Sequence, residues 1–470
     1  MPNLVESAVP ARKPPLDEAF RPAVVANRRF REAVAASGGG VPLVLGLERP
    51  EGSLSRFETT VFPDTHPSAA ENLWYAERLL KFLLWQRGGF RVHVGGPEKV
   101  ARHLQQCYSP EGTRAFDWRF MGEDVYQKPF TVVGCRPGDV PPERESERSL
   151  GRHLDGCRIG FDLGASDLKV SAVVEGKPVF SREIEWQPRE HPDPRYHRHM
   201  VLSALHLAAA RLPRLDAIGG SSAGIYVESR PMIASLFRGI PRERYGEVRD
   251  MFLRIRRELG VPMEVVNDGE VTALAGSMSL EDDSILGVAL GSSEAAGYIT
   301  PKGNITDWLN ELAFAPVDYA PDAPVDEWSG DRGVGALYFS QQCVFRLAPC
   351  VGIEVPADAT PARKLEIVQE KLESGHEGAR RIWETMGVYL GYGVAHYAEF
   401  YRLKHVLILG RCTSGSGGPL LLEGAKAVLR DELPGGAGRI NIQLPDEKSR
   451  RVGQSIAAAS LPPTAGGGPS

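Results

Sequence analysis

The chain has 470 residues, a formal net charge of −5, and a composition that is 42% hydrophobic and 24% charged. This balance is typical of globular proteins, and the length is sufficient for two or three domains that each bury a core. Charges of both signs are mixed along the chain, which gives no broad basic surface, so we do not expect nucleic acid as a partner.

The apolar runs of the sequence are all shorter than the roughly 20 residues that a membrane-spanning helix needs. The first residues, MPNLVESAVPARKPPLDEAF, lack the apolar stretch of a signal peptide. We therefore expect a cytoplasmic protein without a membrane partner. The six cysteines form no CxxC pair, which argues against a zinc knuckle and against a disulfide framework. We expect them to be reduced and structural.

A polar, Pro-rich stretch near residue 150, PGDVPPERESERSLGRHLDG, predicts a linker between two patterned regions. Residues 1–150 have an α/β pattern, because strand-like runs (VPLVLGL, FETTVF, FRVHVGG) alternate with helical ones (AENLWYAERLLKFLLWQRG, PEKVARHLQQC). This region contains no motif of known role, and the aromatic residues of FDWRFMGEDVYQKPF are expected in a core or an interface. The Pro- and Gly-rich end, residues 457–470, is expected to be a flexible tail.

A first glycine hairpin is predicted in RIGFDLGASDLKV, where two strand patterns flank a turn at Gly164. Asp162 ends the first strand, Gly164 allows close approach of the backbone, and Ser166 with the amides that follow can donate hydrogen bonds. Such a hairpin can hold a phosphate and its magnesium ion. Taken alone, DxGxS is a weak signal that favours a plain acidic β-turn.

Two further glycine clusters follow. SILGVALGSSEAAGYITPKGNI predicts a hairpin around Gly291-Ser292-Ser293. HVLILGRCTSGSGGPLLLEGAKAVLRDEL predicts a strand, a glycine loop from Gly410 to Gly418, and a helix, an order that lets a nucleotide lie against backbone at a helix start. The Walker A pattern GxxxxGK[ST] is absent, as is the acidic ribose partner of a Rossmann unit.

The ordered motifs DLGAS, AGIYV, VVNDGEVTALAG, ALGSS, NELAF, SGDRGVGALYFS and LILGRCTSGSGG resemble the ROK family of sugar kinases, within the actin-like ATPase superfamily. The resemblance covers about residues 157–456 and none of residues 1–150. It implies an α/β fold of two ribonuclease-H-like lobes, 157–280 and 281–456, with ATP bound in a cleft that closes by hinge motion, and an additional N-terminal α/β region.

The resemblance also assigns roles to residues. Asp268 would be the general base, and Asn267 and Glu311 would bind the substrate. ATP would bring Mg²⁺, with Asp162 as a possible ligand. The nucleotide would be bound by Asp162, Gly164, Ala165, Ser166, Lys169, Gly291, Ser292, Ser293, Gly410, Ser414 and Gly415. Two alternatives stay open from the residues themselves: Asp268 as a helix N-cap, and Glu311 as an ordinary solvated or capped carboxylate.

The departures from the family pattern lie where the family binds sugar and zinc. Where members commonly carry Gly-Glu-x-Gly-His and a CxCGxxGC element, this chain has NELAF and, at 329–334, SGDRGV. Phe314 replaces the histidine, and neither Ser329 nor Val334 supplies a thiolate, so we expect no structural zinc. Ala336 replaces a sugar-contacting glutamate. Glu294, in the second phosphate loop, would repel a triphosphate unless it points away.

Three functions are therefore considered. The leading one is an ATP-dependent kinase acting on a hydroxyl of a sugar or sugar-like molecule. The second is a sugar- or nucleotide-binding regulatory protein that has lost turnover, and the third is an actin-like ATPase that acts on a protein partner. A ROK repressor is disfavoured because residues 1–150 do not resemble a helix-turn-helix. A homodimer stays open, since the sequence does not indicate the oligomeric state.

Overall fold

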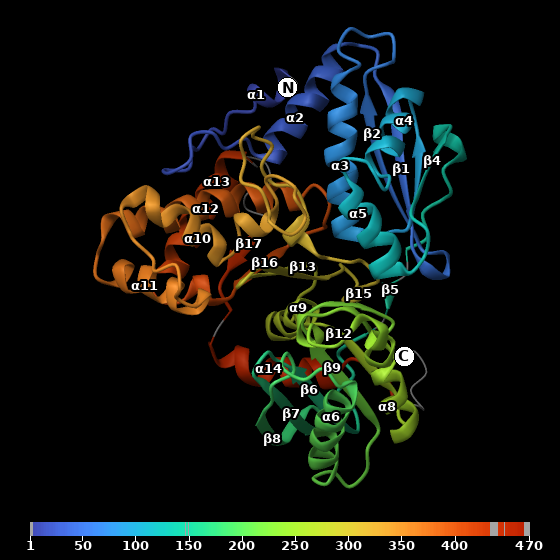
Figure 1. Cartoon of the computed structure of the whole chain (residues 1–470), viewed down its shortest axis with the longest axis vertical. Coiled ribbons are helices and arrows are strands. Elements are labelled where there is room, and N and C mark those ends of the chain that lie inside the picture. The colour runs from blue at the N-terminus through green and yellow to red at the C-terminus, as the bar shows by residue number, and fades with distance from the viewer. Residues whose placement is uncertain (1–2, 146, 149, 433–439, 446, 465–470) are drawn as a thin grey trace. The chain divides into compact units, whose positions relative to one another are not determined.

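The computed structural model describes residues 3–145, 147–148, 150–432, 440–445 and 447–464. The chain divides into two compact units (Figure 1). Unit 1 comprises Met1–Ser146, Val288–Ala296 and Trp308–Leu444, and unit 2 comprises Glu147–Gly287, Gly297–Asp307 and Pro445–Ser470. The N-terminal region, expected from the sequence as a part of its own, thus belongs to the same unit as most of the second predicted lobe.

The N-terminal part of unit 1 is an α/β layer. Its sheet has the strand order β2-β1-β3-β4, in which β1 pairs antiparallel with β2 and β3, and β3 pairs parallel with β4. Helix α3 lies along this sheet (Figure 1). The bounds are α1 Asn3–Glu6, α2 Ala23–Ala36, β1 Val41–Glu48, β2 Leu54–Val61, α3 Glu71–Arg87, β3 Arg91–Gly95, α4 Glu98–Cys107, α5 Ala115–Arg119 and β4 Thr131–Cys135. The strand and helix patterns that the sequence predicts here are all present.

The C-terminal part of unit 1 is mainly helical. Helix α12 is apolar along most of its length, is buried from Thr385 to Tyr397, and packs along α13. Two glycines of α12 make this contact close, since a Cβ on Gly391 would lie 2.5 Å from the side chain of Val428. The bounds are α10 Gln341–Leu347, α11 Pro361–Glu373, α12 Glu377–Tyr397, β16 His405–Leu409, α13 Gly417–Glu432 and β17 Asn441–Gln443.

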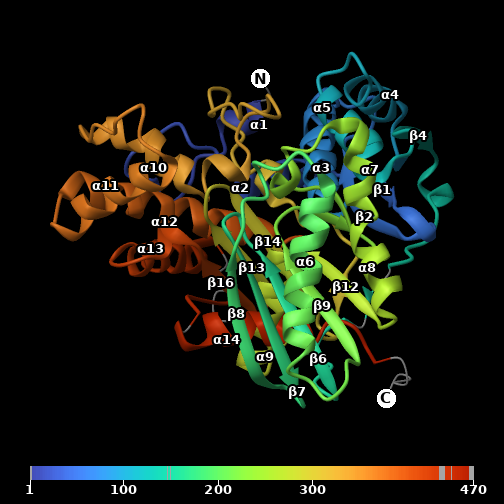
Figure 2. The same cartoon turned by 60° about the horizontal axis from the view of Figure 1, so that its bottom comes forward.

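Unit 2 is built on a five-stranded sheet with the order β12-β9-β6-β7-β8. Strands β12, β9 and β6 are parallel, whereas β7 and β8 continue the sheet as antiparallel hairpins. Helix α6 lies along the sheet, as Figure 2 shows. The bounds are β6 Cys157–Leu163, β7 Asp167–Val174, β8 Lys177–Glu185, α6 Pro194–Ala209, β9 Ala217–Ser222, β10 Ile225–Val227, β11 Arg230–Ile233, α7 Tyr245–Arg249, α8 Met251–Leu259, β12 Met263–Asn267, α9 Asp268–Leu280 and α14 Glu447–Ala459.

A second, six-stranded sheet has the order β17-β16-β13-β14-β15-β5. Its remaining strands are β13 Ile285–Leu290, β14 Glu294–Ile299, β15 Ile305–Thr306 and β5 Glu147–Arg148. The division between the units falls within β13 and β14, so the turn that joins these strands, which contains Gly291, belongs to unit 1.

The end of the chain differs from its prediction. We expected a flexible tail from residue 457, but helix α14 continues to Ala459, and Leu461 is also buried. Two glycines explain the difference. A Cβ on Gly160 of β6 would lie 2.1 Å from the carbonyl oxygen of Ser455, and one on Gly219 of β9 would lie 1.6 Å from that of Ala458. The backbone of α14 therefore lies directly on the sheet, and small residues suffice to bury it. Residues 465–470 lie outside the described residues.

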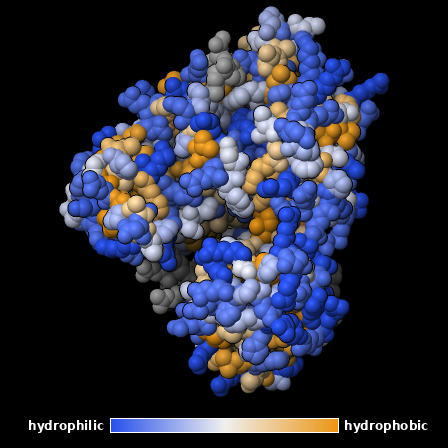
Figure 3. All heavy atoms as spheres, in the orientation of Figure 1, coloured by the Kyte–Doolittle hydropathy of each residue, from blue (hydrophilic) through white to orange (hydrophobic). Residues whose placement is uncertain are grey.

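The visible face of the molecule is mostly hydrophilic, with hydrophobic residues in small separate groups (Figure 3). Within the described residues, no helix has the length and apolar character needed to cross a membrane.

Candidate functional site

Polar side chains gather in unit 2 where the three parallel strands end. The register places Asp162 of β6 beside Ser221 of β9, and in the next row Ser222 of β9 beside Asn267 of β12. Asp268 follows Asn267 as the first residue of α9. The carboxyl ends of parallel strands are where open α/β sheets bind ligands. The structure thus brings together Asp162, Asn267 and Asp268, which are far apart in the sequence.

The first glycine hairpin is confirmed, with β6 and β7 paired antiparallel around Gly164. The amide of Gly164 donates to the carbonyl of Asp167 at 2.8 Å, and the Gly164 carbonyl accepts from Trp186 Nε1 at 2.9 Å. Ala165 and Ser166 are exposed at the tip, and Lys169 Nζ lies 3.4 Å from Asp167 Oδ1. The backbone of Gly164 is therefore fixed by Asp167 and Trp186, while the tip of the turn is exposed to solvent.

Asn267, rather than Asp268, is the N-cap of helix α9. Its Oδ1 accepts from the amide of Gly269 at 2.7 Å, and its Nδ2 donates to the carbonyl of Gly224 at 2.6 Å. Asp268 Oδ1 also accepts from the Gly269 amide, at 3.0 Å. Capping therefore does not depend on Asp268 alone. Asn267 keeps one amide proton and one acceptor lone pair for a ligand.

The carboxyl group of Asp268 is held in an unfavourable environment for its charge. Burial raises its pKa to about 6, with the negative charge of Asp162 adding to the shift and the hydrogen bond from the Gly269 amide opposing it. The pKa of Asp162 is also raised by burial, while a hydrogen bond from Ser221 acts in the opposite direction. Asp268 is thus ionised at neutral pH yet readily protonated, which suits a group that accepts a proton.

Two hydroxyl groups beside Asp268 were not predicted. Burial raises the pKa of the Tyr226 phenol well above its usual range, and the charge of Asp268 contributes. The hydroxyls of Ser222 and Tyr226 lie close enough to influence each other, yet neither has a partner of hydrogen-bond geometry within the described part of the chain. Buried hydroxyls normally have a partner, so these two are candidates for ligand contact. The signal was present in the sequence, since Ser221-Ser222 end a strand just as Asn267-Asp268 do.

The two glycine loops of unit 1 meet at their backbones. Gly410 has φ +95°, and a Cβ there would lie 2.4 Å from the carbonyl oxygen of Leu290, at the end of β13. The turn at Gly291 is closed by its amide, which donates to the Ser293 carbonyl at 3.1 Å. The Ser292 carbonyl accepts from Gln342 Nε2 at 3.3 Å. Only glycine at position 410 permits this approach.

The predicted nucleotide residues Ser414 and Gly415 are exposed just before helix α13. Next to them, Ser416 donates its amide and its hydroxyl to Glu373 of α11, at 2.7 and 2.9 Å. These bonds hold the pKa of Glu373 below its usual range. The amide and the hydroxyl of Ser416 are therefore bound by the carboxylate of Glu373, within the glycine loop at which the sequence predicted nucleotide binding.

Glu294 points away from the loop that contains it. It is 2% exposed, its Oε1 accepts from the hydroxyl of Tyr397 at 2.9 Å, and a Cβ on Gly335 would lie 2.0 Å from its Oε2. Burial raises its pKa to about 8, with the Tyr397 hydrogen bond opposing and the charge of Glu311 adding. The group is neutral at pH 7, so the repulsion of a triphosphate that we considered does not arise from it.

The segment that departs from the family pattern is packed with aromatic rings. Phe314, in place of the histidine, has its ring centroid 4.6 Å from that of Trp85 and 5.1 Å from that of Trp328. Glu311 is half-buried and Ala336 is buried. Phe116 of the FDWRFMGEDVYQKPF stretch joins the same cluster, which places these aromatic residues in packing. Within the described residues, no group of three or more His, Cys, Asp or Glu side chains could hold a metal ion.

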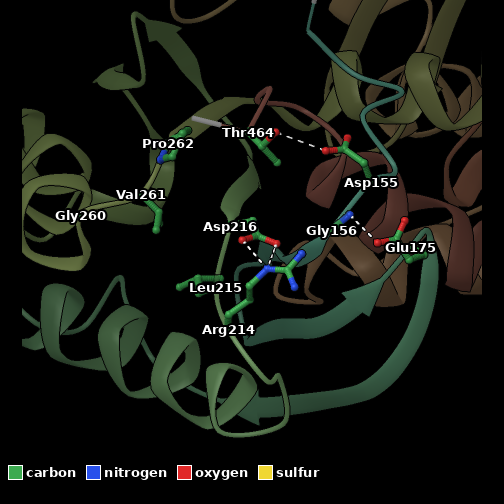
Figure 4. A pocket seen from close by; sticks show the side chains of 10 residues that line it. All are labelled: Asp155, Gly156, Glu175, Arg214, Leu215, Asp216, Gly260, Val261, Pro262 and Thr464. Carbon is green, nitrogen blue, oxygen red and sulfur yellow. Dashed lines mark hydrogen bonds and ion pairs between the residues drawn. The ribbon is translucent and has the colours of Figure 1, made fainter. Parts of the chain in front are cut away.

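Unit 2 also has a pocket of about 500 Å³ at the opposite edge of its sheet (Figure 4). Its residues precede the parallel strands: Gly156 before β6, Asp216 before β9 and Pro262 before β12. Arg214 pairs with Asp216 at 2.9 Å within it. This edge is formed by the amino ends of the strands, so the pocket is separate from the residues around Asp268.

No family model matches the chain, and no curated protein matches it. Solved structures do match. The ROK hexokinase of Thermus thermophilus is 16% identical, with a TM-score of 0.52 over 65% of this chain and 98% of its own. A ROK family transcriptional regulator, a homologue of the E. coli Mlc protein, is 16% identical, with a TM-score of 0.51 over 66% of this chain and 79% of its own. The chain has the fold of the ROK proteins.

The expected fold class is thereby confirmed, since the ROK proteins that match share the two-lobed α/β architecture that the motifs implied. The match to the ROK hexokinase leaves about a third of this chain without a counterpart.

Proposed function

We propose that this chain is an ATP-dependent kinase of the ROK family that phosphorylates a hydroxyl of a sugar or sugar-like molecule. The observation that carries the proposal is the environment of Asp268. This carboxylate lies at the carboxyl end of β12, has a pKa of about 6, and lies beside Asp162 and two buried hydroxyls that lack a hydrogen-bond partner in the described part of the chain. The fold shared with a ROK hexokinase supports the same reading.

The chemistry follows from the position of Asp268. Its carboxylate accepts the proton of the substrate hydroxyl while that oxygen attacks the γ-phosphorus of ATP, and the bond to the departing ADP breaks. Phosphoryl transfer requires mainly positioning and charge stabilisation. We assign the positioning of the substrate to Asn267 and Glu311, and add Tyr226 because its hydroxyl has no partner among the described residues.

The residues present fit a nucleotide with its magnesium ion. Asp162 and Asp268 repel each other and both have raised pKa values, so a nearby cation would be stabilised, and Mg²⁺ prefers oxygen ligands. Asp162 would hold the ion, which neutralises phosphate charge when bound. The amides of Gly164 and Gly291 close their own turns, so neighbouring backbone N–H groups of these turns and of the loop at Gly410 would donate to the phosphates. A cytoplasmic location and a homodimer remain expectations.

Incubation of the purified protein with Mg-ATP and a panel of hexoses, N-acetylhexosamines and their derivatives, with ADP release as the readout, tests the proposal. We expect ADP release that depends on one class of sugar and that is lost in Asp268→Asn. ADP release that is equal with and without every sugar would instead support an ATPase that acts on a protein partner.

A regulatory protein of the same fold is the second candidate, because a ROK transcriptional regulator matches this chain as well as the hexokinase does. This function predicts that a sugar binds, detected by calorimetry or by a melting shift, while no ADP is released. The same panel therefore separates the two functions.

A further inference from the structure

We propose that the N-terminal region positions Glu311 for the substrate, and that Asp331 is the residue through which helix α3 and its neighbours hold the Glu311 segment in place. The segment concerned, residues 310–334, is called the acceptor segment below. The inference rests on the proposed function, since it gives Glu311 a substrate to bind. All the residues involved lie in unit 1.

The first contact is at the C-terminus of α3. The last carbonyl groups of a helix have no partner within the helix. Here the carbonyls of Trp85 and Gln86 accept the amides of Glu311 and Asn310, at 2.9 and 2.8 Å. The hydroxyl of Tyr401 donates to Asn310 Oδ1 at 2.9 Å. The acceptor segment thus caps α3, and the backbone of Glu311 is fixed by that helix.

The second contact is a backbone ladder between the start of α2 and the middle of the acceptor segment. The amide of Ala23 donates to the carbonyl of Val317, and the amide of Tyr319 donates to the carbonyl of Arg21, both at 2.9 Å. Asp318 Oδ1 accepts the amide of Arg21 at 2.9 Å. Residues 21–23 therefore hold the segment a few positions after Glu311.

The third contact is a buried cluster of charges at the end of the acceptor segment. Asp331 is 6% exposed, and it binds Arg114 at 2.6 Å, Lys81 at 3.2 Å and Arg78 at 3.3 Å. Burial alone would raise the pKa of Asp331, but the positive charges of Arg78 and Lys81 hold it below its usual value. The carboxylate is therefore ionised, and three cations of the N-terminal region bind it.

The charges of this cluster balance only when Asp331 is included. Lys81 also binds Asp117, at 2.9 Å, and Arg78 and Arg114 both bind Glu77. Three cations, Arg78, Lys81 and Arg114, then face three carboxylates, and Asp331 is the only one of the three that the acceptor segment supplies. Loss of its charge would leave an uncompensated cation in a buried site, which is costly.

Trp85 connects these contacts. Its Nε1 donates to Asp117 at 2.7 Å, its ring packs on Phe314, and its carbonyl accepts the Glu311 amide. A change in the charge cluster can therefore shift the side chain of Trp85, and with it the Trp85 carbonyl that binds the Glu311 amide. Asp331 acts as a positioning residue, because it contacts other protein groups rather than the substrate.

The test compares Asp331→Asn with Asp331→Glu, which keeps the charge. For Asp331→Asn, we expect the KM for the sugar to rise between about tenfold and 10²-fold, since a misplacement of about 1 Å can have that effect, with the KM for ATP unchanged. Asp331→Glu should recover most of the affinity. Hydrogen exchange of the 310–314 amides should become at least about tenfold faster in Asp331→Asn, and exchange in helix α6 should stay the same.

Two further variants keep the test decisive if Asp331→Asn folds poorly. Tyr401→Phe removes one hydroxyl that holds Asn310 and should raise the KM for the sugar by roughly threefold. Glu432→Gln is the control: it breaks an ion pair at 2.8 Å between Arg28 and Glu432 of α13, whose carboxylate is 7% exposed and which includes no residue of the acceptor segment. It should leave both KM values unchanged.

The outcomes separate this inference from the proposed function. Unchanged exchange and an unchanged sugar KM in Asp331→Asn and Tyr401→Phe would overturn the positioning role, even with full kinase activity. If no sugar supports turnover, the proposed function fails, and the exchange of the 310–314 amides then decides by itself whether the N-terminal region fixes the segment.

Discussion

Two groups of carboxylates, one in each unit, differ in the charges around them. In unit 1, Asp331 and Asp117 each lie against lysine or arginine. In unit 2, Asp162 and Asp268 lie close to each other, and Lys169, a cation that acts on Asp162, is paired with Asp167. The pKa of Asp331 is lowered by its cations, whereas burial raises the pKa of Asp117 despite Lys81, and the pKa of Asp268 is raised to about 6.

The comparison teaches that a partly or fully buried carboxylate does not by itself indicate chemistry. Where its charge is compensated by the protein, the group connects elements of the fold. Where its charge is left without compensation, the protein has accepted a cost in stability, and that is typical of sites that bind cations or exchange protons. The contrast can be tested by changing the charges of each group.

The largest effect is expected for Asp268→Asn. If the carboxylate is the general base, the variant should retain its fold and its affinity for nucleotide while kcat falls by roughly 10²- to 10⁴-fold. The parental enzyme should also lose kcat/KM as the pH falls through about 6, because protonated Asp268 cannot accept a proton. Steady-state ADP release between pH 5 and 8 measures both.

Stability provides the control for this variant. Asparagine caps a helix about as well as aspartate does, and Asn267 is the N-cap here, so the melting temperature should not fall. At pH 7 it should rise, because the raised pKa of Asp268 means that its buried charge destabilises the folded state. Turnover at the parental rate in Asp268→Asn would mean that the residue is not the base.

The second effect concerns the compensated group. Lys81→Met keeps an unbranched side chain that is one atom shorter, but it leaves Asp117 and Asp331 with one cation fewer in a site where Lys81 is 1% exposed. Breaking a buried pair in this way lowers the free energy of unfolding by about 3–5 kcal/mol. Urea unfolding measures the loss, and Lys81→Met combined with Asp117→Asn should recover part of it by restoring neutrality.

The matched substitution in unit 2 is Lys169→Met. Lys169 is half-exposed in its pair with Asp167, and exposed pairs contribute only about 0–1 kcal/mol. An equal loss of stability in the two methionine variants would contradict the distinction between the two groups.

The sequence predicted one of these groups and not the other. Asp162 was found because it lies at the end of a strand pattern before a glycine turn, and Asn267 and Asp268 were found because the motif VVNDGEVTALAG resembles one of the ROK family. In the Asp331 cluster, Arg78 and Asp331 are 253 positions apart in the sequence. A local sequence pattern cannot predict such a pair. The position of Glu294 depends likewise on Tyr397 and Gly335, and the burial of α14 on two glycines in distant strands.

Glu294 is a third kind of carboxyl group, buried with no cation among the described groups that shift its pKa. Its pKa of about 8 in the folded protein lies above its ordinary value of 4.5, so the folded state binds a proton that the unfolded state loses as the pH rises. Its contribution to stability is complete below about pH 4.5 and is lost as the pH rises to about 8. Glutamine at position 294 has no proton to lose. The free energy of unfolding of Glu294→Gln, relative to that of the parental protein, should therefore be higher at pH 8 than at pH 5 by on the order of 1–3 kcal/mol.

Unfolding of Glu294→Gln and the parental protein at the two pH values measures this difference. A glutamine that destabilises the protein equally at pH 5 and pH 8 would show that Glu294 is ionised in the folded state and that an unseen cation compensates it.

The smallest effect is expected for Tyr226→Phe, which extends the comparison from charges to hydroxyls. The hydroxyl of Tyr226 is buried near Asp268 without a partner among the described residues, so its removal should not lower stability. If it binds the substrate, the KM for the sugar should rise by roughly three- to tenfold, the range of a single hydrogen bond, with the KM for ATP unchanged.

Tyr245→Phe in the same unit is the control. It removes a hydroxyl that accepts the Ala234 amide at 3.2 Å, and it should lower stability by about 1 kcal/mol without changing either KM. We thus expect Tyr226→Phe to weaken sugar binding without loss of stability, and Tyr245→Phe to lower stability without a change in sugar binding. A loss of stability in Tyr226→Phe with an unchanged sugar KM would show that the hydroxyl serves the fold and not the substrate.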